Sequence, residues 1–242
     1  MSESLAALAA RVVAVRQRVA EACTRAGRDP AEVTLVAVTK TLPAATVRAA
    51  YAVGLRDFGE NYAQELRDKA LQLADLAELR WHFIGPLQRN KAQHVVGTAA
   101  LIHTVASTAL IERLAALAAQ RGTAQGVLLQ LNLSGEGTKS GARAEELPAL
   151  LAALGAHPQQ LHGIGLMTMP PQSADPQQTA PIFAALRQLR DTFADHWAAD
   201  PAAAAARLGA LSMGMSADYA VAIAEGATLV RVGSAIFGQR AP

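Results

Sequence analysis

The chain has 242 residues, 51% of them hydrophobic and 17% charged, with a formal net charge of +2, which predicts a globular protein with a sizeable buried core. The basic residues are scattered rather than clustered among aromatic side chains, which argues against a nucleic-acid-binding surface. No apolar run reaches the roughly 18 residues of a membrane span, the start resembles no secretory signal, and Cys23 is the single cysteine, so a soluble cytoplasmic protein is expected.

The first predicted element is an amphipathic helix over about residues 2–26, which Ser2 or Ser4 can cap and Gly27 ends. Short apolar runs typical of buried strands follow at residues 33–39, 55–58, 81–84, 101–105, 127–133, 161–167, 208–213 and 228–232. Helical patterns lie between them at residues 43–53, 61–79, 87–96, 108–120, 144–154, 176–199 and 217–225.

Strands that alternate with helices predict parallel pairing through right-handed crossovers. Eight such units in a chain of this length favour an α/β fold, a single-domain (β/α)8 TIM barrel over residues 1–242 with an extra N-terminal helix. An open, doubly wound sheet is the alternative, but no Gly-x-Gly-x-x-Gly turn follows the first strand.

A lysine ends the first predicted strand. Lys40 follows an apolar run directly, and Pro43 prevents the strand from continuing. A buried ammonium is costly, and desolvation lowers the pKa of a lysine, so its neutral amine becomes a nucleophile that can form a Schiff base. The alternative is an ordinary strand-end lysine with a packed stem and a hydrated head group.

The loops after the last two predicted strands have the composition of an anion site. Residues 212–216, Ser-Met-Gly-Met-Ser, lead into a predicted helix that Ser216 can cap, and Gly233 and Ser234 follow the eighth strand. Backbone N–H groups at helix starts bind anions, and these two loops commonly hold a phosphate in this barrel. Each loop alone is equally consistent with an ordinary cap and glycine turn, but the two together favour a phosphate ligand.

Three further polar residues lie at strand ends. Arg231, if it faces inward, places a permanent cation in the barrel mouth, with a structural ion pair as the alternative. Asn61 and His82 could bond to or stack on a ring, although a packed, non-ligand role is the commoner fate of such residues. The histidines show no metal-ligand spacing and no nucleophile elbow is present. A Schiff-base lysine, an arginine and a phosphate cradle at one mouth indicate a pyridoxal 5'-phosphate site.

Six motifs, spread in order over essentially the whole chain, resemble those of the pyridoxal phosphate homeostasis protein family, whose members are alanine-racemase-like barrel proteins. The motifs lie at residues 38–41 (Val-Thr-Lys-Thr), 58–62 (Phe-Gly-Glu-Asn-Tyr), 81–91, 138–141, 211–216 and 230–238. The departures are small, because Thr39 stands where serine is common and Arg89 where a small polar residue is usual.

The resemblance implies a barrel like the N-terminal half of alanine racemase, with pyridoxal 5'-phosphate held as a Schiff base on Lys40. Ser216, Gly233 and Ser234 would grip the phosphate, and Arg231 would face the pyridine nitrogen. Further cofactor contacts are expected at Asn61, His82, Met167 and Ser212.

Two classes of function are open at this point. An arginine at the pyridine nitrogen favours an unprotonated ring, which is a poorer electron sink than a carboxylate would create. The related racemases take a second base, a tyrosine, from an additional domain across a dimer, and this chain ends shortly after its eighth strand. We therefore expect a monomeric, non-catalytic protein that stores, buffers or delivers pyridoxal 5'-phosphate, with apo forms of pyridoxal phosphate enzymes as candidate recipients.

The enzyme alternatives are a weak pyridoxal phosphate-dependent amino-acid racemase and a Schiff-base aldolase that acts on a sugar phosphate. Lys139, in the glycine-rich loop 134–141, is a second lysine near the mouth. An exposed loop lysine is the simpler interpretation, and a role in handing over the cofactor is the other.

Overall fold

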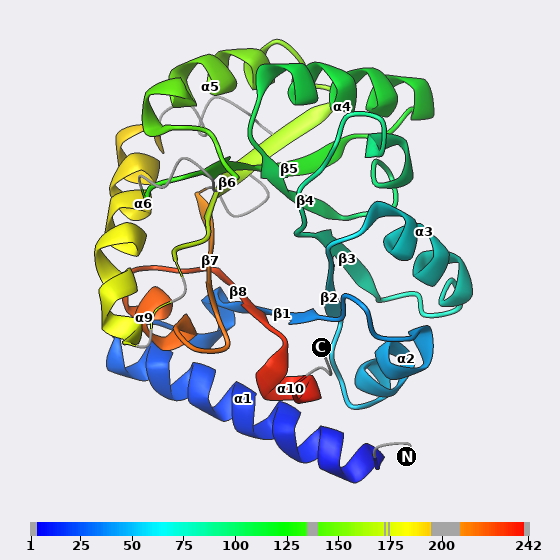
Figure 1. Ribbon diagram of the computed structural model, residues 1–242, viewed down its shortest axis with the longest axis vertical. Helices are drawn as coiled ribbons and strands as arrows, with labels where there is room; N and C mark the ends of the chain where they lie inside the picture. The colour runs from blue at the N-terminus through cyan, green and yellow to red at the C-terminus, as the bar shows by residue number, and fades with distance from the viewer. Residues whose placement is uncertain (1–3, 135–139, 172, 174, 195–208, 240–242) are drawn as a thin grey trace.

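The computed structural model describes residues 4–134, 140–171, 173, 175–194 and 209–239. Its strands form a closed parallel barrel in sequence order, in which β8 pairs back to β1 (Figure 1). The strands are β1 (Thr34–Val38), β2 (Asp57–Glu60), β3 (Arg80–Phe83), β4 (Leu101–Val105), β5 (Gln125–Leu131), β6 (Leu161–Thr168), β7 (Ala210–Met215) and β8 (Leu229–Val232). The predicted (β/α)8 barrel is confirmed.

Helices form a ring around the barrel (Figure 1). The α-helices of this ring are α2 (Ala44–Ala52), α3 (Ala63–Gln72), α4 (Thr108–Arg121), α5 (Leu147–Gly155), α6 (Ala180–Thr192), α9 (Tyr219–Ala224) and the short α10 (Ser234–Phe237). Short 3-10 helices are η1 (Pro30–Glu32), η2 (Ala92–His94), η3 (Ala144–Glu146) and η4 (Pro176–Thr179).

Three predicted helices are shorter in the structure. Residues 87–96 form turns around η2 rather than an α-helix, and α3 ends at Gln72 instead of reaching residue 79. In both segments the backbone closes tight three-residue turns, as from the Val95 N–H to the Ala92 carbonyl and from the Leu76 N–H to the Leu73 carbonyl. The third helix begins only at Ala180, after η4, and the predicted residues 195–199 lie outside the described residues.

The extra helix α1 (Leu5–Arg25) lies across the outside of the barrel, against α9 and α10 (Figure 1). The Ser4 side chain caps it by accepting a hydrogen bond from the Ala7 N–H at 3.2 Å, as the sequence predicted. Its buried stripe includes Val12, Val15 and Val19. Helix α1 therefore ties the first part of the chain to the last.

The strands bury both faces. Their outward side chains join the helices in the main core, and a smaller apolar cluster fills the barrel interior with Val36, Leu101, Leu128, Met167, Ala210 and Leu229. Polar side chains share that interior, among them His82, His103 and Ser212, each at most 5% exposed. Buried polar groups require hydrogen-bond partners. In this barrel His82, His103 and Ser212 are bonded one to the next along the interior. In the described part of the chain, no helix is long and apolar enough to cross a membrane.

Candidate functional site

A cavity of about 680 Å³ opens at the carboxyl ends of the strands. That volume is typical of small-molecule sites, and in barrels of this type the chemistry lies at this end. Its walls come from the segments after β1, β6, β7 and β8. Five of the predicted site residues line it: Lys40, Ser216, Arg231, Gly233 and Ser234.

A tight turn between β1 and α2 presents Lys40 to this cavity. The Leu42 N–H closes the turn on the Thr39 carbonyl at 3.0 Å, and Pro43 then caps α2. Thr41, directly after Lys40, has a φ of 64°, a left-handed conformation that costs a residue with a Cβ about 1–2 kcal/mol. Such strain is common where a backbone must hold a functional side chain in one direction.

A buried ionic cluster, made of Thr39, Glu60, Glu65 and Lys69, supports this turn from the helix side. The Lys69 ammonium donates to the Thr39 carbonyl at 2.8 Å, to Glu60 at 2.7 Å and to Glu65 at 2.8 Å. The Thr39 hydroxyl also donates to Glu60, at 2.7 Å. Burial raises the pKa of the Glu60 carboxyl, although Lys69 and Thr39 act in the opposite direction. The ionic cluster thus holds the backbone beside Lys40 in place.

The loops after β7 and β8 are bonded to each other. The Gly233 N–H donates to the Ser216 hydroxyl at 3.2 Å. Ser216 does not cap the following helix, contrary to the sequence prediction, because Asp218 occupies the N-cap position of α9 and accepts from the Met215 N–H at 2.6 Å. Gly214 makes this turn possible, since its φ is 90° and a Cβ there would lie 2.6 Å from the Ala222 Cβ.

Arg231 points into the barrel and is 4% exposed. Its guanidinium donates to the Ser212 hydroxyl at 2.6 Å and to the Thr168 carbonyl at 3.1 Å. Burial lowers the pKa of Arg231 to about 10, and the negative charge of Asp218 partly counteracts that effect. The side chain therefore stays cationic at neutral pH at the floor of the cavity.

Ser212 and Met167 lie below the cavity rather than in its wall. The Ser212 hydroxyl is fully buried against Arg231, so it supports that side chain. Met167 packs in the apolar cluster of the barrel interior, and Met169, two residues later, lines the cavity instead. Alternate residues along a strand point to the same face, so Met169 points the same way as Met167 but lies one step closer to the carboxyl end, at the cavity.

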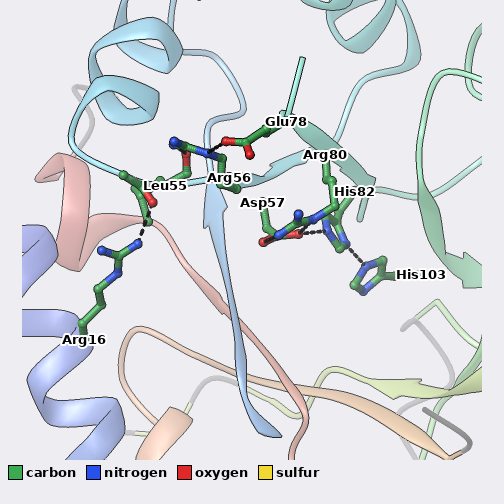
Figure 2. Close-up of polar contacts among 9 residues, drawn as sticks. Arg16, Leu55, Arg56, Asp57, Glu78, Arg80, His82 and His103 are labelled. Atoms are coloured by element: carbon green, nitrogen blue, oxygen red, sulfur yellow. Dashed lines mark hydrogen bonds and ion pairs between the residues drawn. The ribbon is translucent and has the colours of Figure 1, made fainter. Parts of the chain in front are cut away.

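Asn61 and His82 are not among the residues that line the cavity. The backbone of Asn61 packs directly on Gly85. A Cβ added to Gly85 would lie 2.1 Å from the Asn61 carbonyl oxygen. The His82 ring faces Asp57 and His103, with 3.0 Å and 2.9 Å between the bonded atoms (Figure 2). The expectation that His82 sits at the carboxyl mouth is corrected, because its ring points toward the amino end of the barrel.

Sequence reasoning missed Asp218 as well as Met169. Asp218 occupies the N-cap position of α9, where aspartate is a preferred residue. Its carboxylate accepts from the Met215 N–H, three residues earlier, rather than from the helix, and that contact has no signal in the sequence. The second lysine, Lys139, lies outside the described residues. Within the described ranges, no group of three or more His, Cys, Asp or Glu side chains is arranged to hold a metal ion.

Sequence comparisons relate the chain to known proteins. The family model for the alanine racemase N-terminal domain matches residues 5–241. The chain is 44% identical over 236 residues to the pyridoxal phosphate homeostasis protein of Pseudomonas aeruginosa, which covers 98% of this chain and 97% of that relative. It is 41% identical over 229 residues to the Escherichia coli K12 protein of the same name, with 93% and 94% covered.

Solved structures give the same relationship. PipY of Synechococcus elongatus PCC7942, determined with PLP bound, superposes with a TM-score of 0.81 at 38% identity and covers 96% of this chain and 100% of that chain. Alanine racemase from Corynebacterium glutamicum shares the fold, with a TM-score of 0.64 at 18% identity, and covers 98% of this chain and 62% of the racemase.

Proposed function

We propose a function from an established premise: the chain belongs to the pyridoxal phosphate homeostasis protein family. We propose that it binds pyridoxal 5'-phosphate in the cavity beside Lys40 and stores, buffers or delivers it. The related PipY structure contains PLP, and the family is named for this role. The observation that carries the proposal is that Lys40, Arg231 and the two bonded loops meet at one cavity.

The residues around the cavity fit this cofactor. Ser216 and Ser234 offer hydroxyl groups that can donate to a phosphate. In α10 the Ile236 and Phe237 N–H groups already donate to the Gly233 carbonyl, which leaves the N–H groups of Ser234 and Ala235 as the candidates for a phosphate. Arg231 is a donor without acceptor capacity, which suits an unprotonated pyridine nitrogen. Lys40 lines the cavity in the segment that follows β1. Strand β1 pairs with β8, which carries Arg231, so the two side chains come from adjacent strands.

Each residue then has one task. The Lys40 amine, in its unprotonated form, would join the cofactor aldehyde through a C=N bond with the release of one water. Arg231 holds the ring nitrogen without transferring its own proton. When bound, pyridoxal phosphate supplies an electron sink, and a neighbouring arginine makes that sink weaker than a carboxylate would.

A carrier fits the cavity better than a racemase does. Among the described lining residues, the titratable ones are Lys40, Asp218 and Arg231. Asp218 is engaged with the Met215 N–H, and burial raises the pKa of its carboxyl. Two-base racemisation, the kind that the resemblance to the racemases implies, needs a base on each face of the substrate carbon. We therefore propose a non-catalytic role, with a weak racemase as the alternative that the assay below tests.

We further propose that the protein acts as a monomer in the cytoplasm. Cys23 is buried in α1, and burial raises the pKa of its thiol, as suits a structural cysteine in a reducing compartment. Light scattering on the purified protein measures the molecular mass directly, and a dimer mass would contradict the monomer.

The binding site is tested by absorption and by chemical trapping. The protein is reconstituted with pyridoxal 5'-phosphate, reduced with borohydride and digested, and the labelled peptide is identified by mass spectrometry. We expect a visible band and a label on Lys40, both absent from Lys40→Ala and both retained in the control Lys91→Ala. A colourless protein, or a label elsewhere, would contradict the proposed site.

Carrier and enzyme are separated by turnover. We expect amino-acid racemisation no faster than in Lys40→Ala, together with cofactor transfer to an apo form of a pyridoxal phosphate enzyme. Racemisation well above that control would establish an enzyme. The same transfer assay tests Lys139, because an unchanged rate in Lys139→Ala would exclude its role in handing over the cofactor.

A further inference from the structure

A line of hydrogen bonds runs through the barrel from its amino end to the cavity. We name it the axial chain, and it consists of Asp57, His82, His103, Ser212 and Arg231. The joined atoms are 3.0 Å apart from Asp57 to His82, 2.9 Å from His82 to His103, 2.8 Å from His103 to Ser212 and 2.6 Å from Ser212 to Arg231. Figure 2 shows its first half, in which His82 lies between Asp57 and His103.

The two ends of the axial chain fix the direction of every bond in it. Asp57 ends it as a carboxylate, because hydrogen bonds from His82 and Arg80 outweigh the effect of burial and lower its pKa to about 2. A carboxylate only accepts, so a neutral His82 ring carries its proton on Nε2 and accepts at Nδ1. His103 then donates from Nε2 to that nitrogen and accepts at Nδ1.

The other end gives the same direction. The guanidinium of Arg231 only donates, so the Ser212 oxygen accepts from it. The Ser212 hydroxyl can then donate to the free Nδ1 of His103. Every donor has an acceptor with both rings neutral. Burial, together with the charge of Arg231, lowers the pKa of His103 well below its usual value. The bond dipoles therefore all point from Arg231 toward Asp57.

The axial chain helps to compensate the buried positive charge of Arg231. Its two hydrogen-bond partners, a serine hydroxyl and a backbone carbonyl, are neutral, and the side chain is buried. A buried charge needs compensation. Asp218 supplies some through space, and bonds aligned in one direction add to it because each polarises the next.

The far end of the axial chain is reachable from solvent. Asp57, Arg80 and His82 line a second cavity, of about 430 Å³, at the amino end of the barrel. Arg80 holds Asp57 with two bonds, at 2.8 Å and 2.6 Å, and its own side chain is 55% exposed. The two ends of the barrel are thus connected by one continuous line of polar groups.

We propose that Asp57 is a positioning residue for Arg231, acting through the proton positions of His82 and His103. It keeps His103 as an acceptor toward Ser212, so the Ser212 oxygen stays available to Arg231 and the guanidinium stays oriented toward the cavity. If His103 carried its proton on Nδ1, the Ser212 oxygen would have to accept from both His103 and Arg231, and the Ser212 hydroxyl would lose His103 as the acceptor of its own proton. The effect on a bound ring nitrogen rests on the proposed function, whereas the proton positions do not.

The test uses the apo protein with 15N-labelled histidine. Long-range proton–nitrogen NMR spectra distinguish the protonated from the bare nitrogen of each ring. We expect His82 and His103 both protonated on Nε2, with Ser212→Ala and His82→Gln used to assign the signals. A wild-type spectrum with the His103 proton on Nδ1 overturns the proposal without any variant having to fold.

Two variants separate the axial chain from the ion pair. Asp57→Asn removes the anion, whereas Arg80→Gln removes the ion-pair partner and leaves the carboxylate in place. We expect Asp57→Asn to shift the His103 tautomer ratio by about tenfold toward Nδ1, because bonds to ionised groups are about twice as strong as neutral ones. Arg80→Gln should leave the ratio unchanged. An unchanged ratio in Asp57→Asn, or equal shifts in both variants, overturns the proposal.

A second measurement reads out the cofactor. After reconstitution, the visible band of Asp57→Asn should move in position or in its pH midpoint relative to wild type, while that of Arg80→Gln should not. Should the protein bind no cofactor, the proposed function fails and the apo NMR result still decides the proton positions. A tautomer shift with no change in the band would overturn the claim that Asp57 acts on Arg231.

Discussion

Lys69 is the residue whose removal tests the ionic cluster beside Lys40. It is 4% exposed and is the only cation in the described contacts of Glu60, which is itself fully buried. Lys69→Met keeps the length and volume of the side chain but leaves the carboxylate with the Thr39 hydroxyl alone. Removing one partner of a buried pair costs about 3–5 kcal/mol, so the melting temperature should fall by roughly 6–20 °C in a chain of this size.

The pH dependence identifies the cause. Burial already raises the pKa of Glu60 above its unfolded value, and the loss of Lys69 raises it further. A carboxyl with a raised folded pKa stabilises the fold at low pH and loses that contribution as the pH rises through the folded value. The variant should therefore regain stability as the pH falls from neutral toward the unfolded pKa of about 4.3.

The assay is chemical denaturation of Lys69→Met at several pH values. The control is Arg67→Met on the same helix, whose side chain is 45% exposed and which should cost under about 1 kcal/mol. Lys69→Met combined with Glu60→Gln should recover much of the loss. A loss in Lys69→Met that is equal at neutral and acid pH, with no recovery in the double variant, would refute the account of an uncompensated carboxylate.

Three further predictions follow from backbone conformation and charge. Gly214→Ala should lower the stability by about 1–3 kcal/mol and weaken cofactor binding, because alanine is strained at the left-handed φ of this position and its Cβ would clash with Ala222. The control Gly27→Ala also has a left-handed φ, of 67°, but its Cβ would have no atom within 4 Å, so thermal melts should show a cost of only about 1–2 kcal/mol. Thr41→Gly should leave stability unchanged or raise it by up to about 1 kcal/mol in the same melts, since it removes the strain of a φ of 64°. Asp57, whose pKa is lowered to about 2, should contribute about 2 kcal/mol that is present above its unfolded pKa and is lost as the pH falls through about 2; acid denaturation of Asp57→Asn should lack that component.

The barrel and the cavity could be predicted because their signals are local. Short apolar runs separated by helical patterns specify parallel strands, and the residues at the end of each run must then meet at one mouth. Lys40 and Arg231 lie 191 positions apart in the chain, yet both could be assigned to the same cavity on this argument alone. The extents of three predicted helices were wrong because tight turns and 3-10 helices, as at η2 and η4, have an apolar spacing close to that of an α-helix.

Contacts between strands were beyond this reasoning. His82 and His103 lie on neighbouring strands, 21 residues apart, so no spacing along one helix or strand relates them. Their contact depends on the register of β3 against β4, which pairs His82 with Leu101 and which a single sequence does not specify. The partner of Arg231, the Ser212 hydroxyl, depends in the same way on how β7 pairs with β8.

The pairing of β1 with β8 has a consequence for synthesis of the protein. Lys40 follows β1 and Arg231 lies within β8, the last strand of the barrel to be synthesised, so the cavity is complete only when the entire barrel has been made. A ligand held from both sides binds only this closed form, and at 100 times its dissociation constant it adds about 2.7 kcal/mol to the stability. A shortage of cofactor would then affect newly made chains first, because they have to close the β1–β8 pairing, the longest-range strand pairing of the barrel, without that help.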